Sequence, residues 1–433
     1  MLRFFILTTL VAGSFARAAD DNAGTAPQAP SGSGSSDSAD SSSAGDTVGD
    51  GNAVPSRSLW RRFQVHGTLS QGFIYGSGNN YLTMDSNDGS ARWSEGAINI
   101  STAITDNFHV GIQLHSYIMG ELGRANVQVD WAFADYRVKE WIGVRGGKLK
   151  APMGLFGEIE DTDTLYNWAL LPQAIYEADF RSYNVPVVGG EIYGTVRLPV
   201  GGSVTYQVFG GRRGVASNDG SPLLTWQLYG IALGTQDSGY TYGGDIKWKT
   251  PVRGLRAGVS YDNSRPYDPN AFWGAQYNPY GVPLELRIDS AVSREIYSVE
   301  FTHGKLYLAA EGKHEPHWVA NNGVPVGTSL RNAWYVMGAY HVTDKLTAGS
   351  YFSRVVGTGF DQTFSWIYYD PSNPAYYGND TVANVRYDFN RFFYGKLEGH
   401  YIDGELGPFY PGDNPNGLQK VTRLVIGRIG FTF

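Results

Sequence analysis

The feature that most constrains the fold of this chain is an alternation of apolar and polar residues with a period of two. It begins at Leu59 and recurs in segments of about ten to fourteen residues. In the segment 109–117, the apolar residues Val110, Ile112 and Leu114 alternate with small or polar ones. Because successive side chains of a strand point to opposite faces, this pattern predicts a series of β-strands with one apolar face.

The connections between these segments fall into two classes that alternate along the chain. Seven are very short, at 105–107, 139–140, 199–202, 250–254, 303–304, 343–344 and 389–391. Eight are longer or more polar, near 76–91, 120–125, 151–186, 213–238, 264–292, 314–330, 357–380 and 403–418. Eight hairpins joined by seven turns predict sixteen antiparallel strands, with short turns on one rim and long loops on the other. The segment 225–234 is apolar enough to be a strand, so a count of eighteen stays open.

The charged residues of these segments fall opposite the apolar ones. In 239–249, Tyr242, Ile246 and Trp248 share one face, while Asp245 and Lys247 lie on the other. A dry core would not tolerate the whole charged set, which is Asp245, Lys247, Lys249, Arg256, Lys305, Glu311, Lys313, Arg386, Asp388, Lys396 and Glu398. A water-filled lumen would, and a sheet in hydrocarbon must close to pair its edges. We therefore expect an all-β fold, a transmembrane antiparallel up-and-down β-barrel of about 16 strands. The alternative is a soluble two-sheet sandwich with the charges outside, which leaves the strand count unexplained.

Composition excludes several other classes of protein. The 433 residues include no cysteine, so disulfides, Cys-ligated metals and thiol nucleophiles are excluded. After the first dozen residues, no apolar run is long enough for a membrane-spanning helix. The net charge of −7 disfavours nucleic acid as a partner. The motif 314–317 has the wrong spacing for zinc, and no strand is followed by a glycine-rich loop and a helix, so we expect no metal and no cofactor.

The N-terminal region has the composition of an export signal and a linker. Residues 1–18 combine a short positive start, an apolar core at 4–11 and the small-residue site Ala16-Arg17-Ala18, which predicts a signal peptide. Residues 19–57 are rich in Ser, Gly, Ala and Asp and contain no aromatic residue, which predicts a flexible periplasmic tether. The barrel is then expected to occupy 58–433.

Two segments carry a resemblance to a known family. The chain ends Val425-Ile426-Gly427-Arg428-Ile429-Gly430-Phe431-Thr432-Phe433, which resembles the C-terminal assembly signal of bacterial outer-membrane porins. The segment 147–156, GKLKAPMGLF, with LPQAIY at 171–176, resembles the strand and following loop of the phosphate-selective-porin-like group. The resemblance covers the barrel and implies a sixteen-stranded, homotrimeric channel in the outer membrane. The inward residues mix both signs of charge, whereas the phosphate-selective members carry arginine-rich ladders.

The longest loop, 151–186, is the candidate constriction. Its only basic residue is Arg181, and its six acids are Glu158, Glu160, Asp161, Asp163, Glu177 and Asp179. By the resemblance, this loop folds into the lumen and sets its narrowest point. Acids facing basic wall residues would create a transverse field there; the candidate wall residues are Arg137, Arg145, Arg197, Lys247, Lys249 and Arg256.

The spacing of Leu165, Trp168 and Ala169 in this loop predicts a helix capped at Asp163 or Thr164 and stopped by Pro172. The alternative is an extracellular loop that repels anions or binds divalent cations.

Two channel functions follow from these features. The first is a porin for the passive diffusion of small hydrophilic solutes and ions, with outer-membrane lipid around it. The second is a substrate-selective channel for an oxyanion or a sugar, with inward aromatics as a stacking track: Tyr117, Tyr193, Phe209, Tyr307 and Tyr351. His66, His109 and His115 also face inward and could make the pore sensitive to pH. An outer-membrane hydrolase is disfavoured because no Ser/His or Asp/His grouping stands out, so we expect no enzyme.

Overall fold

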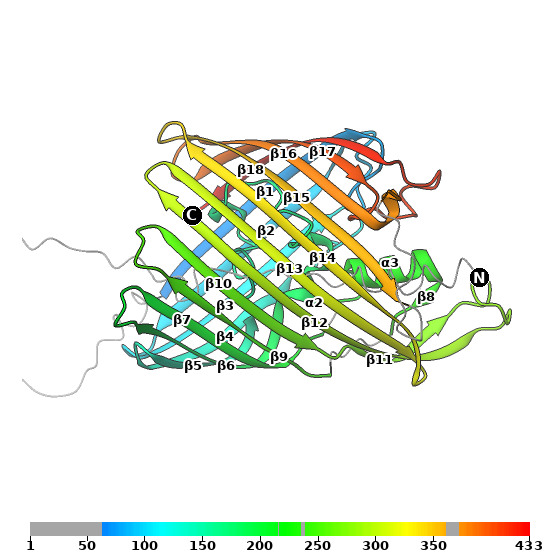
Figure 1. Ribbon diagram of the computed structural model, residues 1–433, viewed down its shortest axis with the longest axis horizontal. Helices are drawn as coiled ribbons and strands as arrows, with labels where there is room; N and C mark the ends of the chain where they lie inside the picture. Colours follow the sequence, from blue (N-terminus) through cyan, green and yellow to red (C-terminus); the bar gives the residue numbers. More distant parts are fainter. Residues whose placement is uncertain (1–62, 215, 235–238, 361–371) are drawn as a thin grey trace, which may run out of the picture.

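The fold is a closed antiparallel β-barrel, seen from the side in Figure 1. The structure is a computed structural model and describes residues 63–214, 216–234, 239–360 and 372–433. The predicted signal peptide, the tether and the first residues of the expected barrel lie outside the described residues. No helix in the described ranges is long and apolar enough to cross a membrane.

The strands follow one another around the wall in chain order. The first half contains β1 (Phe63–Ser77), β2 (Ser90–Ala103), β3 (Phe108–Met119), β4 (Gln128–Lys139), β5 (Ile142–Lys150), β6 (Pro186–Arg197), β7 (Ser203–Arg212), β8 (Ile231–Ala232) and β9 (Thr241–Lys249). The second half contains β10 (Leu255–Ser264), β11 (Tyr267–Trp273), β12 (Leu284–His303), β13 (Leu306–Asn321), β14 (Val324–His341), β15 (Leu346–Phe360), β16 (Tyr377–Asp388), β17 (Phe393–Gly404) and β18 (Val421–Thr432).

These eighteen segments make a wall of sixteen strands. β10 and β11 are two pieces of one strand, because both pair with β12 and only Arg265 and Pro266 separate them. β8 is a two-residue piece that pairs with β11. The ambiguous segment 225–234 forms part of the helix α3 (Gly220–Tyr229) and β8 rather than a wall strand. The predicted count of sixteen is therefore confirmed.

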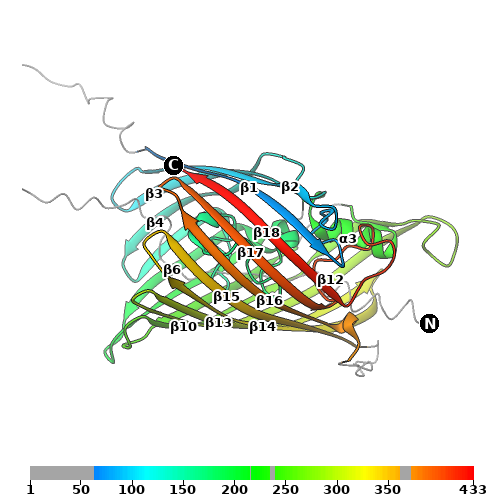
Figure 2. The same ribbon diagram turned by 90° about the horizontal axis from the view of Figure 1, so that it is seen from above.

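The barrel closes where the two ends of the described wall meet. β1 pairs with β18 in antiparallel register from Thr68 opposite Thr432 to Ser77 opposite Arg423. Beyond this ladder, the backbone N–H groups of Gly67 and Phe433 each donate to the other's carbonyl oxygen at 3.1 Å. Figure 2 shows β1, β18 and β17 side by side. Closure leaves no unpaired edge, which is the condition for a sheet in hydrocarbon.

The predicted division between an apolar exterior and a charged interior is confirmed along the strands; of the predicted inward set, Lys305 lies instead in the exposed turn between β12 and β13. Tyr242, Ile246 and Trp248 of β9 are exposed on the outer surface, whereas Asp245 and Lys247 are buried on the inner one. Near the turn rim, the exterior carries a belt of exposed aromatic side chains: Tyr136, Trp141, Trp248, Tyr340, Tyr387, Phe389, Phe393 and Phe433. Such a belt is typical of the interface between hydrocarbon and head groups.

All seven short turns lie where the sequence predicts them, but two of the predicted loops are wrong. The expected loop 264–292 is mostly strand, with only 274–283 between β11 and β12. The expected loop 314–330 is reduced to Asn322 and Gly323, between β13 and β14. Both regions are polar on their outer face, with Glu285, Arg287 and His314 exposed there. The strands continue beyond the apolar band of the exterior. There the outer face of a strand is polar, so polar residues do not distinguish a loop from a strand.

Candidate pore constriction

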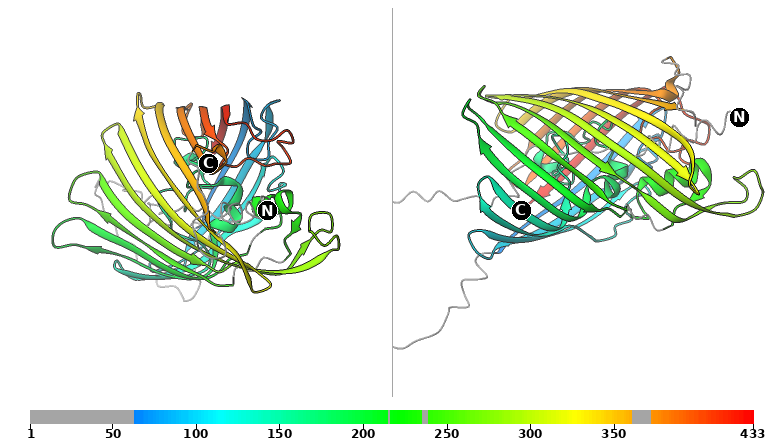
Figure 3. Two further views of the ribbon diagram at one scale, coloured as in Figure 1. Left: turned by 45° about the vertical axis from the view of Figure 1, so that its right-hand side comes forward. Right: turned by 60° about the horizontal axis from the view of Figure 1, so that its bottom comes forward.

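The loop between β5 and β6, residues 151–185, lies inside the barrel. Figure 3 shows this green segment surrounded by the wall. It contains only short helical turns, η2 (Asp163–Leu165), η3 (Ala178–Phe180) and α2 (Arg181–Asn184). Its apolar side chains pack against inward residues of several wall strands in one buried cluster that includes Met153, Trp168, Tyr176, Ile296, Tyr335 and Val382. Burial of this apolar surface favours the folded-in position of the loop.

Charged wall side chains hold the backbone of the loop. The Lys396 ammonium donates to the carbonyl oxygen of Trp168 at 2.7 Å, and the Glu398 carboxylate accepts from the N–H groups of Ala169 and Leu170 at 2.8 and 3.0 Å. The Arg386 guanidinium donates to the carbonyl oxygens of Thr164 and Tyr166 at 2.7 and 2.9 Å. Buried backbone groups need partners, and here the wall supplies them.

These bonds explain why the predicted helix around 163–171 is wrong. Only η2 forms there, and Thr162 at its start makes no side-chain capping bond. The carbonyl and N–H groups that a helix would pair internally are paired with ionic groups of β16 and β17 instead. The helical spacing of apolar residues is therefore incidental in this irregular segment, in which Trp168 and Ala169 are buried and Leu165 is exposed.

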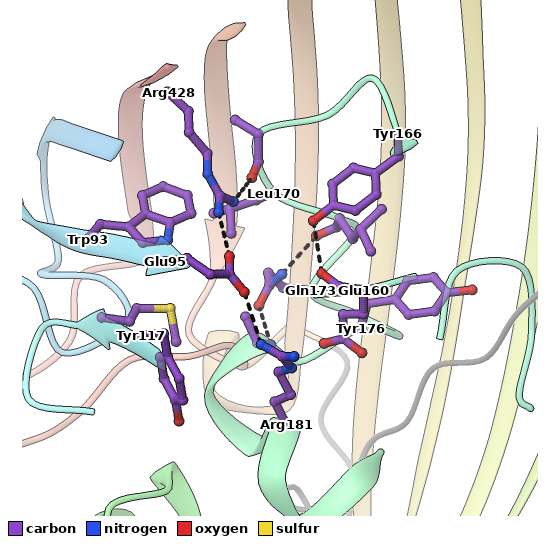
Figure 4. Close-up of a pocket in the computed structure, with 14 residues that line it drawn as sticks. Trp93, Glu95, Tyr117, Glu160, Tyr166, Leu170, Gln173, Tyr176, Arg181 and Arg428 are labelled. Atoms are coloured by element: carbon purple, nitrogen blue, oxygen red, sulfur yellow. Dashed lines mark hydrogen bonds and ion pairs between the residues drawn. The ribbon is translucent and has the colours of Figure 1, made fainter. Parts of the chain in front are cut away.

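A buried network of ions joins the loop to β2 and β18, the two strands that flank β1, as Figure 4 shows around Glu95. Glu95 on β2 accepts from Arg428 on β18 at 2.5 Å and from the loop residue Arg181 at 3.0 Å. Arg428 also contacts Asp163 of the loop at 3.0 Å. The side chain of Arg428 is only 3% exposed, so these charges depend on one another for compensation.

A second set of ion pairs fixes the start of the loop near β4. Lys150, at the end of β5, contacts Asp161 at 2.5 Å and Asp130 at 3.3 Å. Arg181 reaches the same two carboxylates, at 3.4 Å each. The two cations and two anions therefore alternate, and the beginning and the end of the loop are held together.

The other predicted acids of the loop have separate environments. Glu177 forms an ion pair with Arg331 of β14, and Asp179 accepts from the Tyr410 hydroxyl at 2.8 Å. Burial raises the pKa of Glu177 to about 7 and that of Asp179 to about 7. Burial also raises the pKa of Glu160 to about 8, against the opposing effect of Arg181. Glu158 is half-buried, and its backbone carbonyl accepts from Lys150 at 3.1 Å.

Four of the six candidate basic residues of the wall form ion pairs with acids of the wall or its turns, and among the described residues no loop acid takes part in these ion pairs. Arg145 lies 3.4 Å from Asp135 and 3.5 Å from Glu191. The other ion pairs are Lys247 with Asp245 at 3.1 Å, Arg256 with Glu300, and Arg197 with Glu140 at 3.3 Å on the turn rim. Arg137 lies over the ring of Tyr193, 5.7 Å from its centre, and Lys249 is exposed.

The cations that contact the loop acids were not among the sequence candidates. They are Lys150, Arg331, Lys396 and Arg428, together with Arg181 from the loop itself. Lys396 was predicted to face inward, but nothing in the sequence pairs it with residue 163. The alternation along the strands shows which cations face inward. Which of these cations contact the loop acids depends on the path of the loop.

The turn side of the lumen is more open than its middle. Inward residues near the turns are exposed, including His66, His109 and Lys249, and Arg137 and Arg256 are half-buried. His115, further from the turns, is buried and lies 2.9 Å from Glu95. Of the three histidines that the sequence singles out, the two on the turn side, His66 and His109, therefore contact solvent.

The loop side is covered by packed connections. The segment 405–414 contacts both residues 79–84 and helix α3. The Leu82 N–H donates to the Pro408 carbonyl at 3.0 Å, and the Gly412 N–H donates to the Gln227 side chain of α3 at 2.9 Å. Between the loop and the wall lie small cavities of about 50 Å³, lined by Glu95, Arg181 and Arg428, and about 30 Å³, lined by Glu177, Asp179 and Arg331. These have room for water, not for a solute.

Most of the proposed stacking aromatics are covered. Tyr193, Phe209 and Tyr351 are 5%, 3% and 2% exposed, and Tyr351 packs edge-on against Trp168. Tyr117 and Tyr307 are half-buried. A covered ring offers no face to a sugar, so in this arrangement the aromatic track is not continuous.

Comparison with solved structures places the fold. The trimer form of OmpT, an outer membrane protein of Vibrio cholerae, matches with a TM-score of 0.52 and 11% identity, over 86% of this chain and 99% of that one. The anion-selective porin from Comamonas acidovorans matches with a TM-score of 0.50 and 10% identity, over 86% and 99%. Salmonella typhi OmpF matches with a TM-score of 0.50 and 12% identity, over 86% and 97%.

No protein-family model matches the sequence, and no curated protein matches it either. At 10 to 12% identity, the structural likeness describes the fold alone. The chain has the closed sixteen-stranded barrel fold of bacterial outer-membrane porins.

Proposed function

We propose that this protein is a porin of the bacterial outer membrane, through which small hydrophilic solutes and ions diffuse passively, and that it is not an enzyme. The observation that carries the proposal is the closed wall with an apolar exterior and charged inward residues, which are solvent-exposed on the turn side. A chain of this kind is stable only with lipid outside and water inside. Export by the segment 1–18 and a periplasmic tether at 19–57 belong to the same proposal.

The loop 151–186 narrows this channel. Its position in the lumen and its ion pairs with β14, β17 and β18 support this assignment. Four of its acids, Asp161, Asp163, Glu177 and Asp179, are buried, and their contacts with Lys150, Arg428, Arg331 and Tyr410 hold the loop in place. We assign these acids an anchoring role. The electric field that acts on a solute in the channel is then set mainly by the exposed wall residues on the turn side.

Single-channel recording tests the proposal. Full-length protein purified from the membrane and added to a planar lipid bilayer should give stepwise, ohmic increases in current. A preparation that is folded and inserted, as shown by its resistance to protease in vesicles, but that gives no current steps would refute passive conduction.

A second candidate is a channel selective for anions, such as an oxyanion. The observation that favours it is the exposure of cations on the turn side, since the Arg256 side chain is 36% exposed and that of its partner Glu300 only 6%. Residues 147–156 resemble the phosphate-selective-porin-like group, but the inward residues here mix both signs of charge, so the resemblance does not add to the argument for an anion. The covered aromatic residues make a sugar the weaker choice. The sign of the reversal potential in a KCl gradient separates an anion-selective channel from a general one, and millimolar phosphate should block only the former.

We also propose a homotrimer. The resemblance to porins supports this assembly, and one of the structural neighbours is a trimer form. Mass photometry or light scattering of the detergent-solubilised protein measures the assembly directly.

A further inference from the structure

An open groove lies on the outer face of the barrel across β16, β17, β18 and β1. Its volume is about 660 Å³, within the range of roughly 300 to 1,000 Å³ typical of ligand sites. Most of its lining is apolar and comes from Phe73, Val385, Tyr387, Phe389, Leu397 and Ile429. We call it the glycine groove, after the two residues of its floor.

The floor is formed by Gly395 and Gly427, two outward positions without a side chain. Gly427 lies between Leu397 of β17 and Phe73 of β1, and Gly395 lies between Tyr387 of β16 and Ile429 of β18. A side chain at Gly427 would meet no atom within 4 Å, and one at Gly395 would approach only the Phe389 ring and a backbone oxygen. The groove is therefore a gap in the apolar surface that small residues keep open.

The polar side chains along the groove are already paired. Gln71 donates to the carbonyl oxygens of Gly72 and Ala91 at 2.8 Å each and accepts from Ser94 at 2.6 Å. Lys396 and Arg428 contribute to the lining, but their charged ends point into the lumen and contact Asp163. A ligand in the groove thus meets hydrocarbon and satisfied polar groups, which suits an apolar chain.

The turn-side end of the groove has a different character. Phe389 lies there, with its ring centre 5.2 Å from that of Tyr387. The Lys345 ammonium donates to the Phe389 carbonyl at 3.4 Å, and the Arg391 guanidinium lies over the ring of Phe392 at 4.5 Å. Both cations are exposed, as is the neighbouring Asp344, whereas Asp388 pairs with Arg386. An apolar groove ending beside two cations fits an amphiphile with an anionic head.

We propose that the glycine groove binds one phospholipid of the leaflet on the turn side, with an acyl chain on the floor at Gly395 and Gly427 and the phosphate beside Lys345 and Arg391. The charge at one end favours a phospholipid over a second copy of this chain, which would need no cation there. The inference requires only that the wall contacts lipid, so it does not depend on conduction.

The test uses the full chain purified in a mild detergent and native mass spectrometry with added phosphatidylglycerol. We expect one bound lipid on the unaltered protein. Gly427→Leu fills the floor and should weaken binding about tenfold, which corresponds to about 1.4 kcal/mol. Gly399→Leu is the matched control. Gly399 is likewise an outward glycine, on β17; an added side chain would meet no atom within 4 Å, and the residue lies outside the groove.

A second pair of variants tests the head-group site without touching the floor. Lys345→Ala/Arg391→Ala should weaken phosphatidylglycerol while leaving diacylglycerol, which has no phosphate, unchanged; Lys139→Ala/Arg253→Ala, in other turns, is the control. Equal lipid retention by Gly427→Leu and Gly399→Leu would overturn the proposal. Loss of an oligomer in Gly427→Leu with lipid unchanged would also overturn it and identify a second copy as the occupant.

Discussion

Arg428 links three parts of the molecule through one side chain. It contacts Glu95 of β2 and Asp163 of the loop, and it donates to the Ala169 carbonyl at 3.3 Å. Removing one member of a buried ion network leaves uncompensated charge, which costs about 3 to 5 kcal/mol. The loop is then expected to leave its position in the lumen while the barrel itself persists.

We predict that Arg428→Ala gives a channel with larger and noisier current steps than the unaltered protein. Single-channel recording measures both properties. Arg423→Ala is the control, because Arg423 is on the same strand but faces outward over the ring of Tyr401. Currents from Arg428→Ala that match those of the control would show that this residue does not anchor a constriction.

Asp179 gives a prediction about pH. Burial raises its pKa from the usual range to about 7, so the folded protein binds a proton more tightly than the unfolded chain does. Its contribution to stability is therefore fully present below about pH 4 and is lost as the pH rises to about 7. Asp179→Asn should melt at the same temperature as the unaltered protein near pH 4 and at a higher one at pH 8.

The melting temperature in detergent at the two pH values measures this effect, and Asp344→Asn is the control because Asp344 is exposed in a turn. A variant that is less stable than the unaltered protein at pH 8 would mean that Asp179 is ionised and paired when folded. Glu177 has its pKa raised in the same direction, so a residual pH dependence is expected to remain in Asp179→Asn.

At this scale, the sequence draws attention to the acids of the loop but not to the residues that contact them. Asp161 and Asp163 stand out because acids are dense in an otherwise apolar loop. Their partners Lys150 and Arg428 are set by where an irregular backbone passes the wall. No periodicity encodes that path, since it depends on contacts between residues as far apart in the sequence as Asp163 and Arg428.

The loop 151–185 behaves as a single element tied to the wall. Its contacts reach β10 through the Gly154 N–H and the Ser260 hydroxyl at 2.9 Å, and β16 through the side chain of Asn384, which donates to the Asn167 carbonyl at 3.0 Å. Contacts on separate strands restrict its motion as a whole. The proposed constriction should therefore remain in place during conduction.

A cross-link tests this. Because the chain has no cysteine, Asn167→Cys/Asn384→Cys would carry its only two thiols. Oxidation should leave the conductance unchanged and reduce the current noise, since it fixes the loop where it already lies. A large fall in conductance on oxidation, reversed by reduction, would show that the loop must leave the wall for solutes to pass. Either single cysteine variant is the control.

Strands were more predictable than the loop for a physical reason. In β3 and β9, each outward residue meets lipid and each inward residue meets water or the loop, so the period of two is enforced at every position. In 163–171, apolar residues meet a curved wall with no fixed repeat, and the helical spacing of Leu165, Trp168 and Ala169 is incidental. Past the apolar band, as in β13 and β14, the alternation loses its apolar half, so the sequence wrongly predicts loops there.

For the whole molecule, closure follows from the number and kind of the connections. Short turns such as 105–107 need only a few residues of the types that favour a tightly turned backbone, so the sequence predicts them. The even count of strands makes β1 antiparallel to β18, so the two strands can pair like all the others where the wall closes, as the register shows. The extra segments β8 and β11 and helix α3 were not predicted, because each depends on packing at the loop rim.

The contact between Gly67 and Phe433 gives a test of closure. A side chain at Gly67 would collide with the ring of Phe433, and the two residues exchange backbone hydrogen bonds at the end of the seam. Gly67→Leu adds apolar surface to an outward position, which favours lipid contact, but it overpacks the seam at a cost of about 1 to 3 kcal/mol. We predict a lower yield of folded barrel on refolding into phospholipid vesicles, measured by the mobility of unheated samples in SDS gels.

Gly399→Leu makes the same change at an outward glycine with open space and should refold normally. If both variants refold equally well, the seam tolerates displacement of Phe433 and the last pair of residues contributes little to closing the barrel.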